Sequence, residues 1–302
     1  MKKDPKLYDL IDTTEPLATW REIKDIVSML APGYDAGDIE KVFFDIIALF
    51  RGNFPGYRAS NTKYHDLEHT CAVMLAVVRL MHGCSLSGMK FSKKRIFLGV
   101  SAALFHDAGL IQTASDQEGS GAKYTIGHEQ RSIGFMQRYF SDRNYGSQEI
   151  KDCSHLIMCS ILSMSPAEIP FRNREIEMLG KIIGTADLLA QMADRYYCEK
   201  LLLLYQEFEE AGIPDLTSEF DLLKNTEAFY KNIVKKRLQD GFSDVSRHMI
   251  HHFAHRWKVE KDLYAEAIEN NINYLRGVLK NSEDRTSSYK KELRRGRKTD
   301  ER

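Results

Sequence analysis

Residues 97–110 read FLGVSAALFHDAGL, and this stretch decides the fold class. Its first nine residues are mostly apolar, which indicates a helix buried in a core. The helix ends at two polar residues, His106 and Asp107. A buried carboxylate is costly unless it is paired or binds a metal ion. The stretch therefore predicts a core helix that ends at a chemical site.

Helical periodicity continues along the chain, whereas strand-like alternation is scarce. Residues 38–51 place six apolar side chains on one stripe, the pattern of an amphipathic helix. Ser92 and Thr125 stand where helix caps are expected. The predicted helices cover residues 38–51, about 65–81, 92–104, 125–140, 147–163, 172–192, 193–211, 217–239 and 243–279. The sequence thus predicts an all-α, multi-helix bundle.

Three regions are expected along the chain. Residues 1–54 form an N-terminal helical region packed on the core, and residues 55–280 form the main domain. Residues 281–302 are charged and nearly free of apolar side chains, which predicts a disordered tail.

Composition excludes several classes of protein. Lysine plus arginine and aspartate plus glutamate both number 43, and this balance argues against a partner that is a nucleic-acid polymer. No run approaches the roughly 20 consecutive apolar residues of a membrane helix, and the N-terminus does not resemble a signal peptide. The five cysteines are odd in number and form no CxxC pair, so we expect buried structural thiols and a cytoplasmic protein.

Other residues of metal-binding type stand on separate predicted helices. His69 follows His65 by four residues, and His128 and His155 lie on the next helices. Asp187 lies within the hydrophobic segment IIGTADLLAQ. Imidazoles and carboxylates that face inward from several helices are how helical bundles build metal sites.

The ordered series His69, His106–Asp107, His128, His155, Asp187 resembles the two-metal members of the HD superfamily of metal-dependent phosphohydrolases. The resemblance covers roughly residues 55–260 and implies the HD-domain, phosphodiesterase-like fold. It implies that Asp107 bridges the two metals. In this arrangement His69, His106 and Asp187 complete one metal site, and His128 and His155 hold the second metal.

KYHDLEHT, residues 63–70, is similar to a motif of class I cyclic-nucleotide phosphodiesterases. That resemblance makes His69 a ligand and His65 the general acid, with both on one helical face. NTEAFYKNIV, residues 225–234, resembles the segment that holds the base, so Phe229 is expected to stack on it. Two features depart from the family. A second histidine shortly after the HD pair is missing, and Thr226 replaces the glutamine that binds the purine.

The implied chemistry is hydrolysis of a phosphate ester. Two divalent ions, chosen among iron, manganese, zinc and nickel with magnesium admissible at one site, place a bridging hydroxide against phosphorus. His65 protonates the leaving oxygen and needs a carboxylate partner of its own. The expected substrate is a small nucleotide phosphodiester, a cyclic mononucleotide first and a cyclic dinucleotide second.

Several alternatives stay open at this stage. The same scaffold fits a nucleotide phosphomonoesterase, a di-iron oxygenase, or a degenerate domain used for binding. A homodimer is compatible with the sequence. The four histidines of one helical face, His248, His251, His252 and His255, fit a metal patch less well than a groove, a subunit contact or a phosphate contact, because no carboxylate is interleaved.

Overall fold

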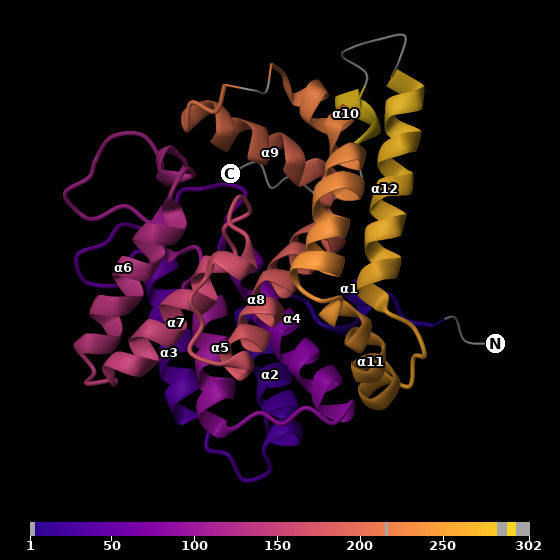
Figure 1. Cartoon of the computed structure of the whole chain (residues 1–302). Coiled ribbons are helices and arrows are strands. Elements are labelled where there is room, and N and C mark those ends of the chain that lie inside the picture. Colours follow the sequence, from indigo (N-terminus) through magenta and orange to yellow (C-terminus); the bar gives the residue numbers. More distant parts are fainter. Residues whose placement is uncertain (1–3, 215–216, 283–288, 294–302) are drawn as a thin grey trace.

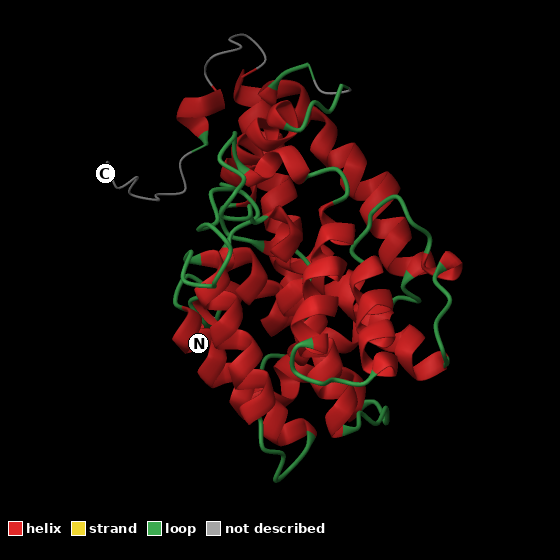
Figure 2. Cartoon of the chain, turned by 90° about the vertical axis from the view of Figure 1, so that its left-hand side faces the viewer, coloured by secondary structure: helices red, strands yellow, loops and turns green. Residues whose placement is uncertain are grey.

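A computed structural model describes residues 4–214, 217–282 and 289–293 of the chain (Figure 1). The described residues fold into helices and loops (Figure 2). Apart from two isolated bridges, Arg51 with Ala59 and Tyr57 with Thr113, these residues form no β-structure. The predicted all-α class is confirmed.

The longer helices are α2 (Pro16–Leu30), α3 (Gly37–Phe50), α4 (Leu67–Leu86), α5 (Lys93–Phe105), α6 (His128–Ser141), α7 (Ser147–Met158), α8 (Arg174–Ala193), α9 (Tyr197–Glu210), α10 (Glu219–Phe229), α11 (Met249–Trp257) and α12 (Leu263–Ser282). The short elements are α1 (Leu7–Leu10), α13 (Tyr289–Glu292), four 3-10 turns, η1 (Ala108–Leu110), η2 (Gly121–Tyr124), η3 (Pro166–Glu168) and η6 (Val245–His248), and two π-helical turns, η4 (Tyr230–Val234) and η5 (Arg237–Gly241).

Helix α4 is the central element, and α8, α2, α11 and α5 pack against it. One hydrophobic cluster extends from the N-terminal helices through α4 to the end of the described chain. Trp20 of α2 stacks on Phe43 of α3 with ring centroids 5.2 Å apart, and both are buried in that cluster. The helices of residues 1–54 therefore share the core of the main domain.

The helix that contains His69 begins later than expected, so the prediction that His65 and His69 share one helical face is wrong. The Asp66 carboxylate accepts a hydrogen bond from the His69 backbone N–H at 2.8 Å and caps α4 at its N-terminus. His65 therefore lies in the preceding loop. The Thr62 hydroxyl holds that loop by donating to the His65 carbonyl at 2.6 Å.

The prediction that Thr125 caps the next helix is also wrong. Gly127, with φ of 84°, directly precedes α6. His128 is therefore the first residue of this helix, which begins later than the predicted range of 125–140. Thr125 follows η2, and its hydroxyl donates back to the Ala122 carbonyl at 2.7 Å. By contrast, Ser92 caps α5 as predicted, since its side chain accepts from the Arg95 N–H at 3.3 Å.

The single helix expected over residues 243–279 is interrupted. Helix α11 ends at Trp257, and Lys258 takes a left-handed φ of 59°. Asp262 then starts α12, because its carboxylate accepts from the backbone N–H groups of Tyr264 and Ala265 at 2.9 and 3.1 Å. The break turns the chain back along the bundle.

The tail expected to be disordered, residues 281–302, lies largely outside the described residues. Residues 281 and 282 are the end of α12, and the later described part forms the short helix α13, which packs on the bundle. Tyr289 lies 5.3 Å from Phe220 between ring centroids, and its hydroxyl donates to Glu219 at 2.9 Å. For residues 289–293 the prediction of disorder is therefore wrong, because one aromatic residue anchors the segment.

Helix α4 is long and apolar enough to cross a membrane, whereas we expected no apolar run of that length. However, 83% of its apolar window is buried inside the protein. Its composition is explained by its central place in the core. The five cysteines are buried and unpaired, as predicted.

Two buried histidines between α4 and α11 predict acid sensitivity. His82 and His252 lie 3.0 Å apart between their Nδ1 atoms. Burial, followed by the charges of His255 and Arg256, lowers the pKa of His82 to about 4. The unfolded chain binds a proton near pH 6.5, so folding stability should fall as pH decreases from about 6.5 to 4. The expected contribution of His82 is about 3 kcal/mol.

Urea unfolding of the His82→Gln variant between pH 7 and 4 tests this expectation. The variant should lose part of the acid dependence of the wild-type protein. His251→Gln is the matched control, because His251 is exposed on the same helix turn as His252. Identical pH slopes for wild type and His82→Gln would contradict the assignment.

Candidate metal centre

His106 and Asp107 end the core helix α5, as the sequence predicts. Both are buried, with exposures of 1% and 2%. The apolar helix places them in the interior, and the chain then turns into η1. The His106 Nε2 atom lies 3.2 Å from Asp107 Oδ2. The two side chains therefore converge on one point and do not diverge to solvent.

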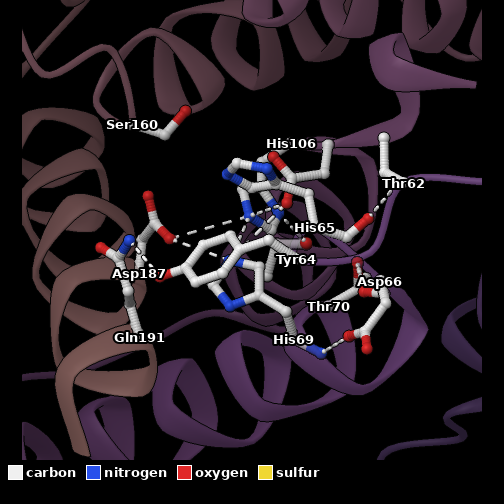
Figure 3. Close-up of polar contacts among 12 residues, drawn as sticks. Thr62, Tyr64, His65, Asp66, His69, Thr70, His106, Ser160, Asp187 and Gln191 are labelled. Carbon is white, nitrogen blue, oxygen red and sulfur yellow. Dashed lines mark hydrogen bonds and ion pairs between the residues drawn. The ribbon is translucent and has the colours of Figure 1, made fainter. Parts of the chain in front are cut away.

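His69 and Asp187 reach the same point from the two central helices, α4 and α8 (Figure 3). The His69 Nε2 atom lies 3.3 Å from Asp187 Oδ1, 3.6 Å from Asp107 Oδ2 and 3.4 Å from His106 Nε2. Four of the predicted ligands are thus brought together.

His128 approaches Asp107 from the other side and completes the His–Asp cluster, which consists of His69, His106, Asp107, His128 and Asp187. Its Nε2 lies 3.3 Å from Asp107 Oδ1, so the Asp107 carboxylate stands between two groups of histidines. Gly109 makes this approach possible, because a Cβ there would lie 2.0 Å from the His128 carbonyl oxygen. Ser132 fixes α6 in place: its hydroxyl accepts from Gly109 N–H and donates to the His106 carbonyl.

Backbone carbonyls orient two of the imidazoles. His106 Nδ1 donates to the Ala103 carbonyl at 2.7 Å, and His128 Nδ1 donates to the Thr125 carbonyl at 2.8 Å. Each bond leaves the Nε2 atom directed at Asp107. Hydrogen bonds of this kind orient the histidine ligands of metal sites.

The electrostatics favour positive charge at this point. Burial alone raises the pKa of Asp107, but His106 and His128 outweigh it and hold that pKa well below its usual range. Burial likewise lowers the pKa of His106, and Asp107 and Asp187 outweigh it and raise the value to about 9. The carboxylates stay ionised in the interior, where a cation stabilises them.

His69, His106 and Asp107 offer ligand atoms that lie within 4.8 Å of one another, and all three are buried. Asp107 Oδ2 makes no hydrogen bond to the described residues although it is shielded from solvent. An orphaned carboxylate oxygen among imidazole nitrogens fits a divalent transition metal. The donor set therefore suits a metal ion.

His65 has the carboxylate partner that its expected role requires. Its Nδ1 donates to Glu207 Oε2 at 2.6 Å. Glu207 of α9 is 3% exposed and also accepts from the Tyr64 backbone N–H at 2.7 Å. Burial raises the pKa of Glu207, whereas His65 and the backbone bonds lower it more, so the carboxylate stays charged. The pair fixes the imidazole beside the cluster, 5.8 Å from the His128 ring between centroids.

A cavity of about 390 Å³ adjoins the cluster. Its wall includes four cluster residues, the predicted acid and the two residues expected to contact substrate. These are His69, Asp107, His128 and Asp187, then His65, then Thr226 and Phe229. The Thr226 hydroxyl donates to the Leu222 carbonyl at 2.8 Å, so this group is bonded within α10.

His155 is not brought into this group. It is buried in α7, its ring lies edge-on to Phe171 at 6.1 Å, and its Nδ1 has no hydrogen-bond partner among the described residues. Burial lowers the pKa of His155. Of the pair expected to hold a second metal, the structure brings only His128 to Asp107.

The histidines of α11 and η6 lie apart from the cluster. His252 contacts His82, and His248 Nδ1 contacts the Ser87 hydroxyl at 2.8 Å. These bonds are made to the C-terminal half of α4, whereas His69 lies in its first turn.

Sequence reasoning missed Glu207, Gln191 and Asn225, and all three bear on the site. Glu207 binds His65, while the amides of Gln191 and Asn225 lie in the cavity wall. Gln191 follows Asp187 by one helical turn and donates to the Tyr64 hydroxyl (Figure 3). No sequence signal marked Glu207, because it stands in an acidic run.

The fold and the site together define an all-helical protein with a buried histidine–aspartate group that could hold a metal ion. The chain belongs to the Npun_R2479-like family, whose model matches residues 18–255. The match includes the whole stretch from His65 to Phe229. No curated protein and no solved structure matches the chain.

Proposed function

We propose that the chain is a metal-dependent phosphodiesterase of the HD type that acts on a small nucleotide. The observation that carries the proposal is the pairing of two features in one cavity wall. A buried His–Asp cluster fit for metal lies beside His65, which a buried carboxylate holds by its Nδ1 atom.

His69, His106, Asp107 and Asp187 would hold one ion, and Asp107 would share a second with His128. Such ions, when bound, activate water and neutralise phosphoryl charge. The chain's own residues do the rest. Glu207 keeps the His65 ring oriented through the hydrogen bond to Nδ1. His65 then gives a proton to the oxygen that leaves phosphorus, and the cavity wall excludes bulk water.

The cavity wall favours a substrate of low charge. Among the described residues that line the cavity, none is lysine or arginine. Apart from the cluster, the wall is largely apolar, from Leu188, Leu201, Leu204 and Phe208. A cyclic mononucleotide carries one negative charge on its phosphodiester, whereas a cyclic dinucleotide carries two. This supports cyclic mononucleotides ahead of cyclic dinucleotides.

A hydrolysis screen of the metal-loaded protein tests the proposal. Cyclic mononucleotides should be hydrolysed, and kcat/KM for the adenine and guanine forms should agree within about tenfold, roughly 1.4 kcal/mol. The reason is that the Thr226 hydroxyl donates its one proton to the Leu222 carbonyl, so it cannot match both polar atoms of a purine edge. Phe229 contributes stacking, which tolerates any base.

Two other outcomes would change the proposal. A strong preference for one base would mean that a neighbouring amide reads it, and Asn225→Ala should then abolish the preference while Thr226→Val should not. Turnover of phosphomonoesters alone would replace the diesterase with a nucleotide phosphomonoesterase.

A further inference from the structure

Arg79 is a buried arginine that has no acidic partner among the described residues. It lies in the middle of α4 with 2% of its surface exposed. Its Nη1 donates to the Tyr264 hydroxyl at 3.2 Å, and its guanidinium lies 5.6 Å from the Phe253 ring centroid. Its Nε and Nη2 atoms are shielded from solvent and have no hydrogen-bond partner among the described residues.

This arrangement is costly for a protein interior. Arginine remains protonated in proteins, so the charge cannot be removed by titration. No carboxylate of the described chain lies within 4.0 Å of it, although other buried cations such as Lys200 have two acidic partners. An uncompensated buried charge is strongly destabilising, which implies a partner that the described part of the chain does not supply.

The geometry of the two orphaned atoms specifies that partner. Nε and Nη2 form the side edge of the guanidinium fork, and their N–H bonds run parallel. This edge matches two oxygens of one carboxylate or phosphate group, whereas a single water occupies only one donor fully. The remaining nitrogen, Nη1, is the one already bonded to Tyr264.

Arg79 lies in the wall of a second cavity, of about 440 Å³. Apolar groups from α1, α4 and α8 form much of this wall, including Leu7, Ala72 and Ala190. A second cation, Arg195, also lines it and lies 4.5 Å from the Tyr8 ring centroid. The cavity is large enough for a small organic molecule.

The acidic residues of this wall are engaged elsewhere. Lys200 contacts both Glu68, at 3.3 Å, and Asp194. Asp12 accepts from the backbone N–H and the hydroxyl of Thr14. Their charge therefore does not neutralise Arg79.

We propose that this second cavity binds a small organic oxyanion, a carboxylate or phosphate monoester with an apolar body, on the Nε–Nη2 edge of Arg79. Both nitrogens are covered by the protein, so binding requires the flexible Arg79 side chain to turn its fork into the cavity and to exchange the Tyr264 contact for the ligand. The site is separate from the metal centre: Arg79 follows His69 by ten residues, roughly 15 Å along α4. The ligand of this second site would therefore differ from the substrate of the proposed hydrolysis.

Thermal unfolding of the full chain with four probes tests this site. The probes are acetate, inorganic phosphate, benzoate and phenyl phosphate, with metal-free protein so that the anions do not bind at the metal centre. Benzoate or phenyl phosphate should raise Tm by about 5 °C near hundredfold saturation, more than acetate or phosphate does. The stronger of the two organic probes identifies carboxylate or phosphate as the headgroup.

Substitutions at Arg79 separate this proposal from a purely structural role. Arg79→Met should abolish the shift and, without anion, should unfold at a temperature equal to or above that of the wild type, because the uncompensated charge is gone. Arg79→Lys should bind roughly tenfold more weakly, since it lacks the fork. Arg276→Met, which alters an exposed arginine, should leave the shift unchanged.

Three results would overturn the proposal. The first is a shift that survives in Arg79→Met, and the second is the absence of any shift in the wild type. The third is a clear loss of stability in anion-free Arg79→Met with normal anion response in Arg79→Lys. Calorimetric titration of wild type with the best probe checks that the shift reflects binding at one site per chain.

Discussion

Replacing Asp107 with alanine is expected to deplete the protein of metal, and this is the largest effect that the site predicts. The carboxylate is 2% exposed, and its two oxygens lie within 3.3 Å of imidazole nitrogens from His106 and His128. Removal of a group that merely orients a ligand typically weakens metal affinity by about 10–100-fold, so loss of this carboxylate should exceed that range. Elemental analysis of purified wild type and Asp107→Ala measures the change.

The controls separate metal loss from general damage. Asp152 is also fully buried, but it pairs with Arg172 at 2.8 Å away from the cluster. Asp152→Ala should therefore lose stability and keep its metal. His128→Ala should preferentially deplete a second ion, and His155→Ala should show whether that histidine contributes at all. Equal metal content in wild type and Asp107→Ala would rule out the cluster as the metal centre.

The sequence predicted the helical class and most helix positions because buried faces impose a clear period on apolar residues. The predicted helix boundaries were wrong where a capping residue decides at which position the helix begins. Asp66 and Asp262 both cap helices, yet each lies in a polar run in which several residues have the same propensity. At the C-terminus, packing of Tyr289 against Phe220 overrides a local composition that favours disorder.

The cluster could be predicted for a related reason. His69, His106, Asp107 and Asp187 interrupt apolar helices, and a polar group there requires a partner. Glu207 gave no such signal, because it stands in the acidic run QEFEE, where each glutamate has the pattern of a solvated residue. Only the packing of α9 shows that this one is 3% exposed and lies against His65, which is 142 positions away in the sequence.

The second large effect concerns His65, which should act on rate and not on metal content. Its Nδ1 is held by Glu207 at 2.6 Å, so its other nitrogen is the one available to a leaving group. His65→Ala should retain its metal and lose about a hundredfold or more in kcat on a nucleotide diester. With a nitrophenyl phosphodiester the loss should be much smaller, because nitrophenolate leaves without a proton.

Glu207→Gln provides the matched test of whether the Glu207 carboxylate supports proton donation by His65. The amide keeps the shape and a carbonyl oxygen that can accept from His65 Nδ1, but it no longer stabilises the positive charge of a protonated imidazole. Glu207→Gln should therefore keep its metal and lose kcat on the nucleotide diester, with a smaller loss on the nitrophenyl substrate, because the charge that supports proton donation by His65 is gone. Equal losses on both substrates in either variant would assign the pair to positioning and leave the proton to another donor.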